Sequence, residues 1–396
     1  MRIAIVTENF LPKLDGVTRT LATMLEHFQR CGHKAIVLGP EGAPHRYAGA
    51  RVYAARGVPL PMYPEIRALF PSRRLEHRLA HFRPDVVHVV DPILLGSAGI
   101  FWARRLHAPI VASYHTNLAA YCDYFRLGWL TAPAWAYRRW LHNHCAVTLA
   151  PSFSTIIQLE QQGFQHLRVW RRGVDSALFS PERRSRVWRS LISGDPDTPI
   201  ALYVGRLSWE KNLGALVSAF IARRYRNARL VLVGDGPARP ELETMLAQQP
   251  VTFTGYLTGV ELAEAYASSD LFVFPSTTET FGQVVLEAMA SGLPVAAYDA
   301  EGVRDNVIHG TTGMLSAPTS TTGLHEAIDA LLAHPYERAR MGRNAREYAR
   351  QYTWDTVMQM LEDTYEEIID GHRAVHRTDS VSTATFTKSS HHTRRA

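Results

Sequence analysis

The chain has 396 residues and a formal net charge of +6, with 46% hydrophobic and 20% charged residues. This is ordinary globular composition, so it excludes a disulfide mini-scaffold, a collagen-like fibre and a wholly disordered chain. The basic excess falls mainly in residues 372–396, where five Lys and Arg stand against one acid, and the remainder is close to neutral. A near-neutral body argues against a general nucleic-acid binder, so we expect no nucleic-acid partner.

The cysteines and the hydropathy pattern indicate in which cellular compartment the protein resides. Cys31, Cys122 and Cys145 include no Cys-x2-Cys pair, and we interpret them as reduced thiols. The first residues lack the basic and apolar segments of a signal peptide. No apolar run approaches the ~20 residues that span a membrane. We therefore expect a cytoplasmic protein.

The first half of the chain alternates predicted strands and helices. The strands are short runs rich in Ile and Val, and the helices carry apolar residues at a helical period. The predicted strands are 2–7, 34–39, 86–90 and 110–113, and the predicted helices are 17–31, 73–82 and 99–106. Such alternation indicates a parallel sheet that is covered on both faces.

The same alternation begins again near residue 199. The predicted strands are 200–204, 230–234, 251–254, 271–275 and 295–297, and the predicted helices are 213–224, 240–246, 259–267 and 283–291. The fold class is therefore α/β, with two doubly wound, Rossmann-like domains that face each other across a cleft.

The domain limits follow from this pattern. We place the first domain at 1–170 and the second at 171–352, with the segment 171–175 as a linker turn between them. An amphipathic helix is predicted at 353–371. Residues 372–396 are rich in Ser and Thr with a single aromatic residue, so we expect a disordered basic tail.

The densest candidate site is the loop from Pro275 to Gly282, between a predicted strand and a predicted helix. Amides left free at the start of a helix can bind a phosphate or a sugar oxygen. Glu279 on the loop and Glu287 on the helix could each hold a pair of sugar hydroxyls, whereas the alternative makes Glu287 a solvated helix residue. The further candidate donor contacts here are Thr280, Phe281, Gly282 and Gln283.

A second candidate segment follows the predicted strand 200–204. Arg206 offers a planar fork of donors and Lys211 a compact cation. Two cations at the carboxyl end of a strand suit a diphosphate, and they could stabilise a leaving diphosphate without a metal ion. The alternative is ordinary surface charge, with Glu210 as the partner.

Two candidates lie in the first half. Asp15-Gly16 forms the turn before the helix 17–31, and glycine lets a backbone approach a ligand closely. His115 follows the strand 110–113, where it could donate to a reacting sugar. Either residue could equally be structural.

Two motif matches are rejected. Asp195 and Asp197 have the Asp-x-Asp spacing of a metal site, but they precede a strand and indicate a turn. Gly234 and Gly236 begin a dinucleotide fingerprint, but Arg239 stands where the third glycine is needed. We expect no metal site and no nicotinamide cofactor.

Together these segments resemble the retaining, two-domain glycosyltransferases of family four, over roughly residues 1–371. The matching segments, in family order and spacing, are 205–212, 233–237 and the pair Glu279 and Glu287. The resemblance implies the GT-B fold, with an acceptor-binding first domain and a nucleotide-sugar-binding second domain. It also implies that the helix 353–371 packs back on the first domain.

The resemblance further implies a role for the candidate residues. Arg206 and Lys211 would grip the diphosphate of the donor. Glu279 would hold the donor hexose and Glu287 the ribose. His115 matches a family histidine that contacts the donor sugar, so the expected catalytic group is His115, Arg206, Lys211 and Glu279. The candidate donor site is completed by Asp15, Gly16, Gly205 and Tyr256.

Three segments, 8–18, 113–117 and 172–175, resemble the glycolipid-making members of the family. Those members are the GDP-mannose-dependent α-mannosyltransferases and the plant and cyanobacterial sulfoquinovosyltransferases. We therefore expect a retaining, metal-independent hexosyltransferase that moves a hexose, mannose from GDP-mannose as first choice, to a lipid or glycolipid acceptor. The nucleotide sugar is a substrate, and no cofactor is expected.

Alternatives remain open. A UDP-sugar-dependent sulfoquinovosyl- or glucosyltransferase to diacylglycerol is one, with Lys13 and Arg19 as candidate cations for a sulfonate. A nucleotide-sugar epimerase and a non-catalytic nucleotide-sugar sensor are others. The segment 67–82 mixes four arginines with apolar residues, which indicates either a peripheral contact with anionic lipid or the solvated face of a packed helix.

Overall fold

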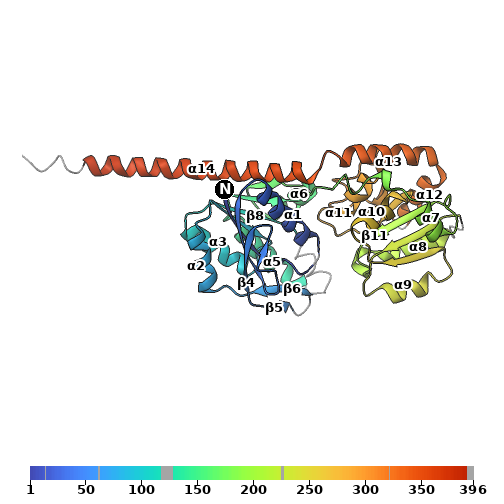
Figure 1. The fold of residues 1–396 in the computed structure, drawn as a ribbon, viewed down its shortest axis with the longest axis horizontal. Helices are drawn as coiled ribbons and strands as arrows, with labels where there is room; N and C mark the ends of the chain where they lie inside the picture. The colour runs from blue at the N-terminus through green and yellow to red at the C-terminus, as the bar shows by residue number, and fades with distance from the viewer. Residues whose placement is uncertain (14, 61–62, 117–127, 224–226, 321, 390–396) are drawn as a thin grey trace, which may run out of the picture.

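Figure 1 shows two α/β domains side by side, with a long helix that leaves the second domain and runs along the first. The computed structural model describes every residue except 14, 61–62, 117–127, 224–226, 321 and 390–396. The described strands form an eight-stranded sheet, a six-stranded sheet and a two-stranded hairpin. The predicted α/β fold with two parallel sheets is confirmed.

The first domain contains the larger sheet. Its strands are β1 (Arg2–Thr7), β2 (Lys34–Pro40), β3 (Arg46–Tyr47), β4 (Ala50–Ala55), β7 (Val86–Val90), β8 (Ile110–Ser113), β9 (Val147–Ala150) and β10 (Leu167–Val169), beside the hairpin of β5 (Gly57–Leu60) and β6 (Tyr63–Leu69). Its helices are α1 (Gly16–Arg30), α2 (Arg73–Phe82), α3 (Leu95–Arg105), α5 (Gly128–His142) and α6 (Phe153–Gln161). The strand order is β10-β9-β8-β7-β1-β2-β4-β3, parallel except for the last pair.

The second domain repeats this architecture. Its strands are β11 (Ile200–Val204), β12 (Arg229–Val233), β13 (Val251–Gly255), β14 (Leu271–Phe274), β15 (Val295–Tyr298) and β16 (Gly313–Ser316), in the parallel order β13-β12-β11-β14-β15-β16. Its helices are η1 (Pro181–Arg183), α7 (Arg186–Ser193), η2 (Trp209–Lys211), α8 (Leu213–Arg223), α9 (Arg239–Met245), α10 (Gly259–Ala267), α11 (Gln283–Ala290), α12 (Gly323–Ala333) and α13 (Pro335–Ala349).

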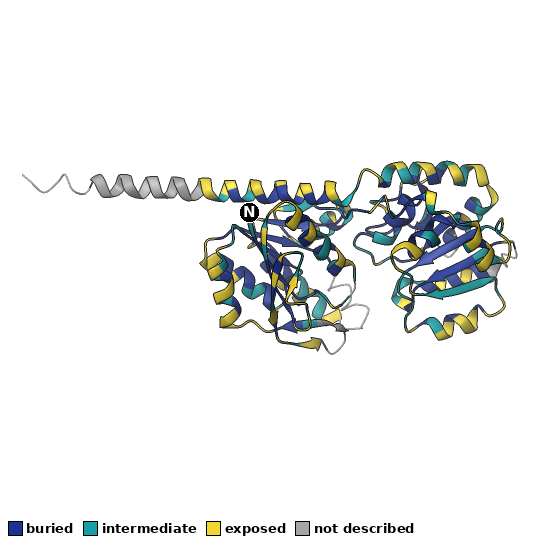
Figure 2. Cartoon of the chain, in the orientation of Figure 1, coloured by how far each residue is buried: buried dark blue, intermediate teal, exposed yellow. Residues whose placement is uncertain are grey.

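The core of each domain is formed by its central strands. β1, β7 and β11 are near-continuous runs of buried residues, as expected for strands with helices on both faces. Figure 2 shows the buried residues concentrated in the sheets and on the inner faces of the helices. In the second sheet the strand order reverses between β11 and β14, and such a switch point is where doubly wound sheets bind ligands.

Helix α14 (Trp354–Ser389) leaves the second domain and packs on the first. Its buried apolar residues belong to the same core cluster as Ile3, Ile5 and Phe28; they are Val357, Met358, Leu361, Tyr365 and Ile369. The first domain therefore takes part of its core from the end of the chain.

The structure differs from the sequence prediction in the tail. Helix α14 continues to Ser389, so residues 372–389 are helical where we expected disorder. The composition correctly indicates that this stretch lacks the apolar residues of a core, but 372–389 also contain no Pro and no Gly that would end a helix. Residues 390–396 lie outside the described part of the chain.

The chain passes between the domains twice, and the two passages touch. The amide of Val174 donates to the carbonyl of Tyr352 at 2.8 Å, and Val174 pairs with Thr353 as an isolated bridge. A Cβ atom at Gly173 would lie 2.5 Å from the backbone of Trp354, so only glycine fits there. The linker and the start of α14 therefore form one compact connection.

Candidate functional site

The loop before α11 lies at the carboxyl end of β14, beside the switch point of the second sheet. Gly282 precedes the helix with a φ of +76°, a left-handed conformation that favours glycine. Gly282 has no side chain to cap the helix, so the first amides of α11 can face a ligand.

This loop is held from behind by residues 300–306. Asn306 Nδ2 donates to the carbonyl of Phe281 at 2.6 Å and to that of Gly302 at 3.1 Å. A Cβ atom at Gly302 would lie 2.6 Å from the carbonyl oxygen of Glu279. The loop is therefore fixed in shape before any ligand binds.

The side chains of this loop have different surroundings. Phe281 is buried in the core of the second domain. Thr280 Oγ1 donates to the carbonyl of His115 at 3.1 Å, and Gln283 Nε2 donates to the carbonyl of Gly173 at 3.0 Å. These two side chains tie the second domain to the first domain and the linker, so contacts of Thr280, Phe281 and Gly282 with a donor would come mainly from the backbone.

Lys211 and Glu279 meet at the switch point. The Nζ atom of Lys211 lies 2.6 Å from Oε1 of Glu279, and both side chains are about three-quarters buried. Asn212 Nδ2 donates to the carbonyl of Pro275 at 3.2 Å, which joins the loop after β11 to the loop after β14. Arg206 is half-buried on the same loop as Lys211.

Gly205 is required by packing. A Cβ atom at Gly205 would lie 2.9 Å from Tyr203 Oη, and one at Gly234 would lie 2.0 Å from the carbonyl oxygen of Gly205. A Cβ atom at Gly236 would similarly lie 2.4 Å from the carbonyl oxygen of Leu207. Gly234 and Gly236, which match the start of a dinucleotide motif, therefore allow the loop after β12 to pack directly against the backbone of the loop after β11.

Glu287 is buried rather than solvated. Arg19 Nη1 of the first domain contacts its Oε1 at 2.7 Å, and Tyr266 Oη donates to its Oε2 at 3.3 Å. Burial raises the pKa of Glu287, and the Arg19 guanidinium partly offsets this shift. The carboxylate is therefore positioned across the interface between the two domains.

His115 lies buried where the first domain meets the second. Arg172 Nη2 donates to its Nδ1 at 2.6 Å, and its Nε2 lies 2.7 Å from Ser113 Oγ. Burial and then the Arg172 charge hold the pKa of His115 well below its usual value. The ring is thus neutral at pH 7, with both nitrogens engaged inside the protein.

Asp15 caps helix α1. Its Oδ1 accepts from the amide of Thr18 at 2.8 Å, and its Oδ2 contacts Lys13 Nζ at 2.8 Å and Asn9 Nδ2 at 2.6 Å. Burial alone would raise the pKa of Asp15, but these contacts together hold it below its usual value. The Asp15 side chain is thereby turned to its own helix.

Gly16 and Tyr256 have open surroundings. A Cβ atom at Gly16 would meet nothing within 4 Å, and Gly16 is absent from the described residues with positive φ. The space around Gly16 would therefore allow a ligand to approach its backbone. Tyr256 follows β13 and is 72% exposed.

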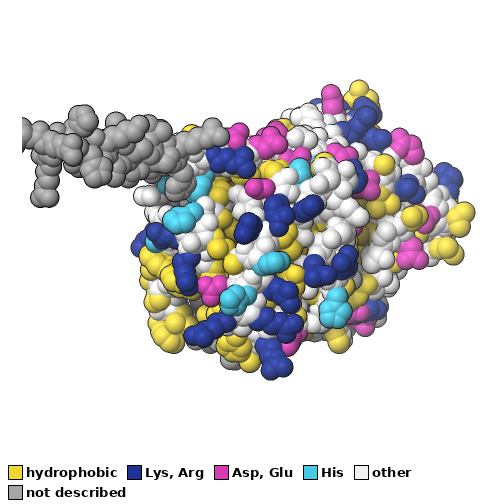
Figure 3. All heavy atoms as spheres, turned by 60° about the vertical axis from the view of Figure 1, so that its left-hand side comes forward, with side chains coloured by type: hydrophobic (Ala, Val, Ile, Leu, Met, Phe, Trp, Pro, Cys, Tyr) yellow, Lys and Arg dark blue, Asp and Glu magenta, His cyan; other side chains and the backbone are white. Residues whose placement is uncertain are grey.

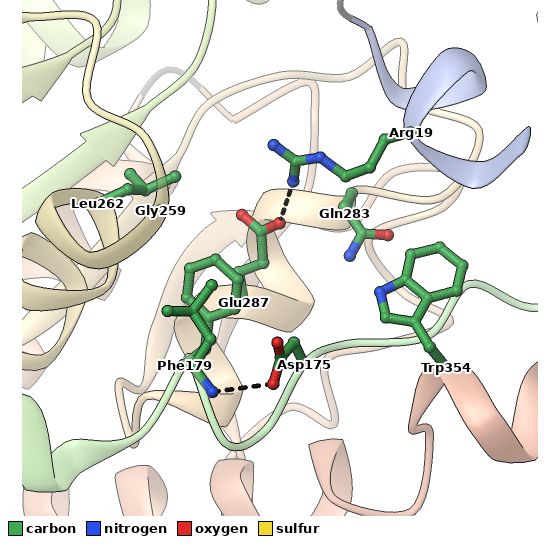
Figure 4. A pocket seen from close by; sticks show the side chains of 9 residues that line it. Arg19, Asp175, Phe179, Gly259, Leu262, Gln283, Glu287 and Trp354 are labelled. Carbon is green, nitrogen blue, oxygen red and sulfur yellow. Dashed lines mark hydrogen bonds and ion pairs between the residues drawn. The ribbon is translucent and has the colours of Figure 1, made fainter. Parts of the chain in front are cut away.

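A cavity of about 250 Å³ lies at the junction of the domains. Figure 4 shows Arg19 of α1 pointing to Glu287 of α11, with Gln283, Asp175 of the linker and Trp354 of α14 around them. Pockets that enclose whole small ligands usually hold ~300–1,000 Å³. A nucleotide sugar would therefore extend beyond this cavity.

Several residues of the junction were missed by sequence reasoning. Arg172 stacks over Trp170 with its guanidinium carbon 5.0 Å from the ring centroid, and burial lowers the pKa of Arg172 to about 10. The amide of Ser154 donates to Asp305 across the domains at 3.1 Å, and Thr155 Oγ1 donates to Glu301 at 2.9 Å. The sequence signals for Arg172 were a pair of arginines inside the linker and the resemblance of the segment 172–175 to glycolipid-making family members, and neither indicated its contact with His115.

The rejected motif and the thiols have clear positions. Asp195 Oδ1 accepts from the amide of Asp197 in a turn before β11, and Asp197 lies 3.3 Å from Arg186. This turn is at the opposite end of the strand from Lys211. Cys31 and Cys145 are free thiols, and Cys122 lies outside the described residues. Asn117, the last residue of the segment 113–117, lies outside them as well.

Two family descriptions match the chain, one per domain. "Glycosyltransferase Family 4" matches residues 14–178, and "Glycosyl transferases group 1" matches residues 189–348.

Curated relatives match over nearly the full chain. A GDP-mannose-dependent alpha-mannosyltransferase of Mycobacterium tuberculosis is 39% identical over 374 residues, which cover 93% of this chain and 97% of that protein. The sulfoquinovosyl transferase SQD2 of Arabidopsis thaliana is 36% identical over 350 residues, which cover 86% of this chain and 68% of that protein.

Solved structures share the fold. HepE of Anabaena in complex with UDP superposes with a TM-score of 0.76 at 20% identity, over 93% of this chain and 100% of that one. A sucrose-phosphate synthase of Thermosynechococcus elongatus gives 0.74 at 21% identity, over 93% of this chain and 99% of that one. The chain has two doubly wound domains with a candidate site at their junction, and its relatives match it along both domains. It therefore belongs to the group 1 and family 4 glycosyltransferases of the GT-B fold.

Proposed function

We propose that this hexosyltransferase moves mannose from GDP-mannose to a lipid or glycolipid acceptor, with retention of the anomeric configuration and without a metal ion. The observation that carries the proposal is the contact between Lys211 and Glu279 at the switch point. This contact places Lys211, a cation that could bind a diphosphate, beside Glu279, a carboxylate that could accept hydrogen bonds from sugar hydroxyls. The donor is supported by the GDP-mannose-dependent relative, which is 39% identical.

The donor would bind between the two domains. Arg206 and Lys211 would hold the diphosphate and stabilise the charge that develops as the glycosidic bond breaks. Glu279 would orient the hexose, Glu287 would accept hydrogen bonds from the ribose, and the backbone near Tyr256 would meet the base. Because Arg19 contacts Glu287 in this structure, donor binding would exchange that ion pair for hydrogen bonds with the ribose.

The first domain would supply the acceptor side. The neutral imidazole of His115, fixed by Arg172 and Ser113, would contact the donor sugar without adding charge. Attack by an acceptor hydroxyl on the face from which the diphosphate leaves would retain the configuration, and the departing phosphate would take the proton. Contact between the domains would exclude water and limit hydrolysis of the donor.

The acceptor proposal includes a peripheral membrane contact at the cytoplasmic face. None of the described helices has the length and hydropathy needed to cross a membrane. Figure 3 displays Lys and Arg side chains gathered over one face of the protein, with hydrophobic side chains between them. In α2, Leu75 and Leu79 are buried while Arg73, Arg74 and Arg78 are exposed, so contact through this helix would be electrostatic.

A second candidate is a sulfoquinovosyltransferase that uses a UDP-sugar. Two observations favour it: the 36% identity with SQD2, and the position of Arg19 in the cavity, where a cation could meet a sulfonate. Lys13, the other cation suggested for this role, contacts Asp15 at 2.8 Å.

Thermal unfolding with GDP, UDP, GDP-mannose and UDP-glucose, each with and without EDTA, tests the donor. A ligand at about 100 times its Kd stabilises the folded state by ~2.7 kcal/mol, which is measurable. We expect a guanine-selective increase in Tm that EDTA does not change. A uracil-selective increase would favour the second candidate, and no increase with any of the four would contradict both.

The transfer step needs its own measurement. Incubation with GDP-mannose and a diacylglycerol or glycolipid acceptor in anionic vesicles should release GDP and give an α-mannoside, identified by NMR. A β-linked product would exclude retention. Release of GDP at the same rate without acceptor would exclude transfer.

A further inference from the structure

Four potential metal ligands gather where the end of α1 meets α14. His27 Nε2 lies 3.6 Å from Cys31 Sγ and 3.2 Å from Glu362 Oε1, and the three ligand atoms lie within 4.8 Å of one another. His33 Nε2 lies 2.8 Å from the same Oε1 atom. No role in the proposed function involves these residues.

The end of helix α1 brings three of these side chains together. His27 and Cys31 are four residues apart, so they lie on one face of the helix, and Cys31 is its C-cap. Gly32 follows with a φ of +73°, and the amide of His33 turns back to the carbonyl of Phe28 at 2.8 Å. The side chains of this His-x3-Cys-x-His segment are thus brought close together at the end of α1.

The fourth side chain comes from far away in the sequence. Glu362 lies on α14, in a stretch whose apolar residues pack into the first domain. Its side chain is 9% exposed, and that of His27 is 7% exposed. Glu362 Oε1 and His33 Nε2 are buried, and neither has a well-directed hydrogen bond despite their short separation. A buried carboxylate oxygen without a hydrogen bond is costly unless something else satisfies it.

A cation among these atoms would satisfy them. Zn²⁺ binds imidazole nitrogen at about 2.0 Å and thiolate sulfur at about 2.3 Å, so tetrahedral ligand atoms lie roughly 3.3–3.6 Å apart. The separations of 3.2 Å and 3.6 Å from His27 Nε2 are of this size. Two imidazoles, one thiol and one carboxylate suit Zn²⁺ better than Mg²⁺ or Ca²⁺, which prefer oxygen ligands only.

We propose that His27, Cys31 and Glu362, with His33 as the fourth ligand, bind one zinc-class cation that fastens α14 to α1. The site is structural rather than catalytic, because it lies about 22 Å along α1 from Gly16 at the other end of the helix. Cys31 is exposed, which gives the cation an entry path. Binding would release the Cys31 proton and replace the contacts among these four side chains with bonds to the metal.

Titration with Co²⁺ tests the site directly. We would use a His391→Gln, His392→Gln variant as the parent protein, because adjacent histidines in the tail could bind metal on their own. One Co²⁺ per chain should bind and give the near-ultraviolet absorption of a thiolate–cobalt bond. Zn²⁺ should displace it and raise the Tm of the parent protein.

Variants assign the ligands. Cys31→Ser should abolish the thiolate absorption, and Glu362→Gln should weaken Zn²⁺ binding at least tenfold while keeping the size of the side chain. Cys145→Ser and His81→Gln are the controls, since Cys145 is a buried thiol elsewhere in the domain and His81 is exposed on α2. Both controls should bind like the parent protein.

The proposal is overturned by several results. Binding of no Co²⁺ by the folded parent protein would exclude the site and leave a hydrogen-bonded cluster only. Thiolate absorption that survives Cys31→Ser, or Zn²⁺ affinity unchanged by Glu362→Gln, would place the metal elsewhere. If Glu362→Gln fails to fold, Cys31→Ser still decides, because Cys31 is exposed and its replacement leaves the core intact.

Discussion

Lys211 joins the two loops on which the proposed donor site depends. Its Nζ atom contacts Glu279 at 2.6 Å, and a bound diphosphate would add a further anionic partner. Lys211→Ala should lower turnover at least tenfold, because the charge that develops on the leaving group would lose one cation. Steady-state release of GDP measures the effect, and circular dichroism checks the fold.

The matched control for Lys211 is Lys34→Ala. Lys34 is exposed at the start of β2 and should leave turnover unchanged. Near-normal turnover of Lys211→Ala in a folded protein would contradict the assignment of this lysine to the diphosphate.

Glu287 should make stability depend on pH. Its pKa is raised in the folded state, mainly by burial, so the folded protein holds the proton more tightly than the unfolded chain does. The stability contributed by the protonated group is complete below the unfolded pKa of about 4.3 and is lost as pH rises through the higher folded pKa. The side chain in Glu287→Gln cannot titrate, so the variant does not lose this stability as pH rises. The free energy of unfolding of the variant minus that of wild type should therefore increase with pH over this range.

Urea unfolding at a series of pH values measures this difference. Glu347→Gln, an exposed substitution on α13, is the control and should show no such trend. A difference that falls with rising pH would mean that the Arg19 contact outweighs burial. The same Glu287→Gln variant should show a smaller increase in Tm with the donor nucleotide.

At the scale of elements, the linker and the start of α14 form a joint that tolerates no side chain. Gly173→Ala would bring a Cβ atom within 2.5 Å of the backbone of Trp354, so the two chain passages must separate. We expect a loss of ~1–3 kcal/mol in the free energy of unfolding, the usual cost of overpacking. Chemical denaturation measures this loss.

Gly214→Ala is the matched control for this joint. Gly214 lies in helix α8, and its Cβ atom would meet nothing within 4 Å. Alanine is favoured in helices, so this variant should gain ~0.5–1 kcal/mol. Equal effects of the two substitutions would mean that the joint adjusts without cost.

At the scale of the whole molecule, the end of the chain completes the first domain. Removal of 354–396 would delete the five buried apolar residues of α14 and expose the core that they cover, and the burial of each contributes ~1.5–3 kcal/mol. Their sum is comparable to the ~5–15 kcal/mol that stabilises a folded domain. The first domain should therefore not fold, as near-ultraviolet circular dichroism would report.

A shorter deletion separates the core from the tail. Removal of 376–396 leaves all five buried residues in place, so the Tm should stay within about 2 °C of the full chain. A large drop would mean that the end of α14 contributes to the fold. A cooperative Tm after removal of 354–396 would contradict the role of α14 in the core.

The elements and several loops could be predicted because their signals are local. The helix 73–82 coincides with α2 and the strand 86–90 with β7, since short runs of Ile and Val and helical apolar periods determine such segments. The helix predicted at 99–106 begins at Leu95 in α3, and β16, α12 and α13 were missed, although α13 begins with Pro335, a residue common at the first position of helices. Polar composition alone led to the prediction of a disordered tail, although no residue in 372–389 ends a helix.

Local sequence patterns are enough to order the strands and helices, to locate the loops at the carboxyl ends of the strands and to indicate the family to which these loops belong. The tertiary structure alone decided which side chains meet. Arg19 and Glu287 are 268 residues apart, His115 and Arg172 are 57 apart, and Glu362 meets His27 only because α14 returns to the first domain. Backbone conformation follows from neighbours within a few residues, whereas these contacts depend on how two domains and a returning helix pack in space.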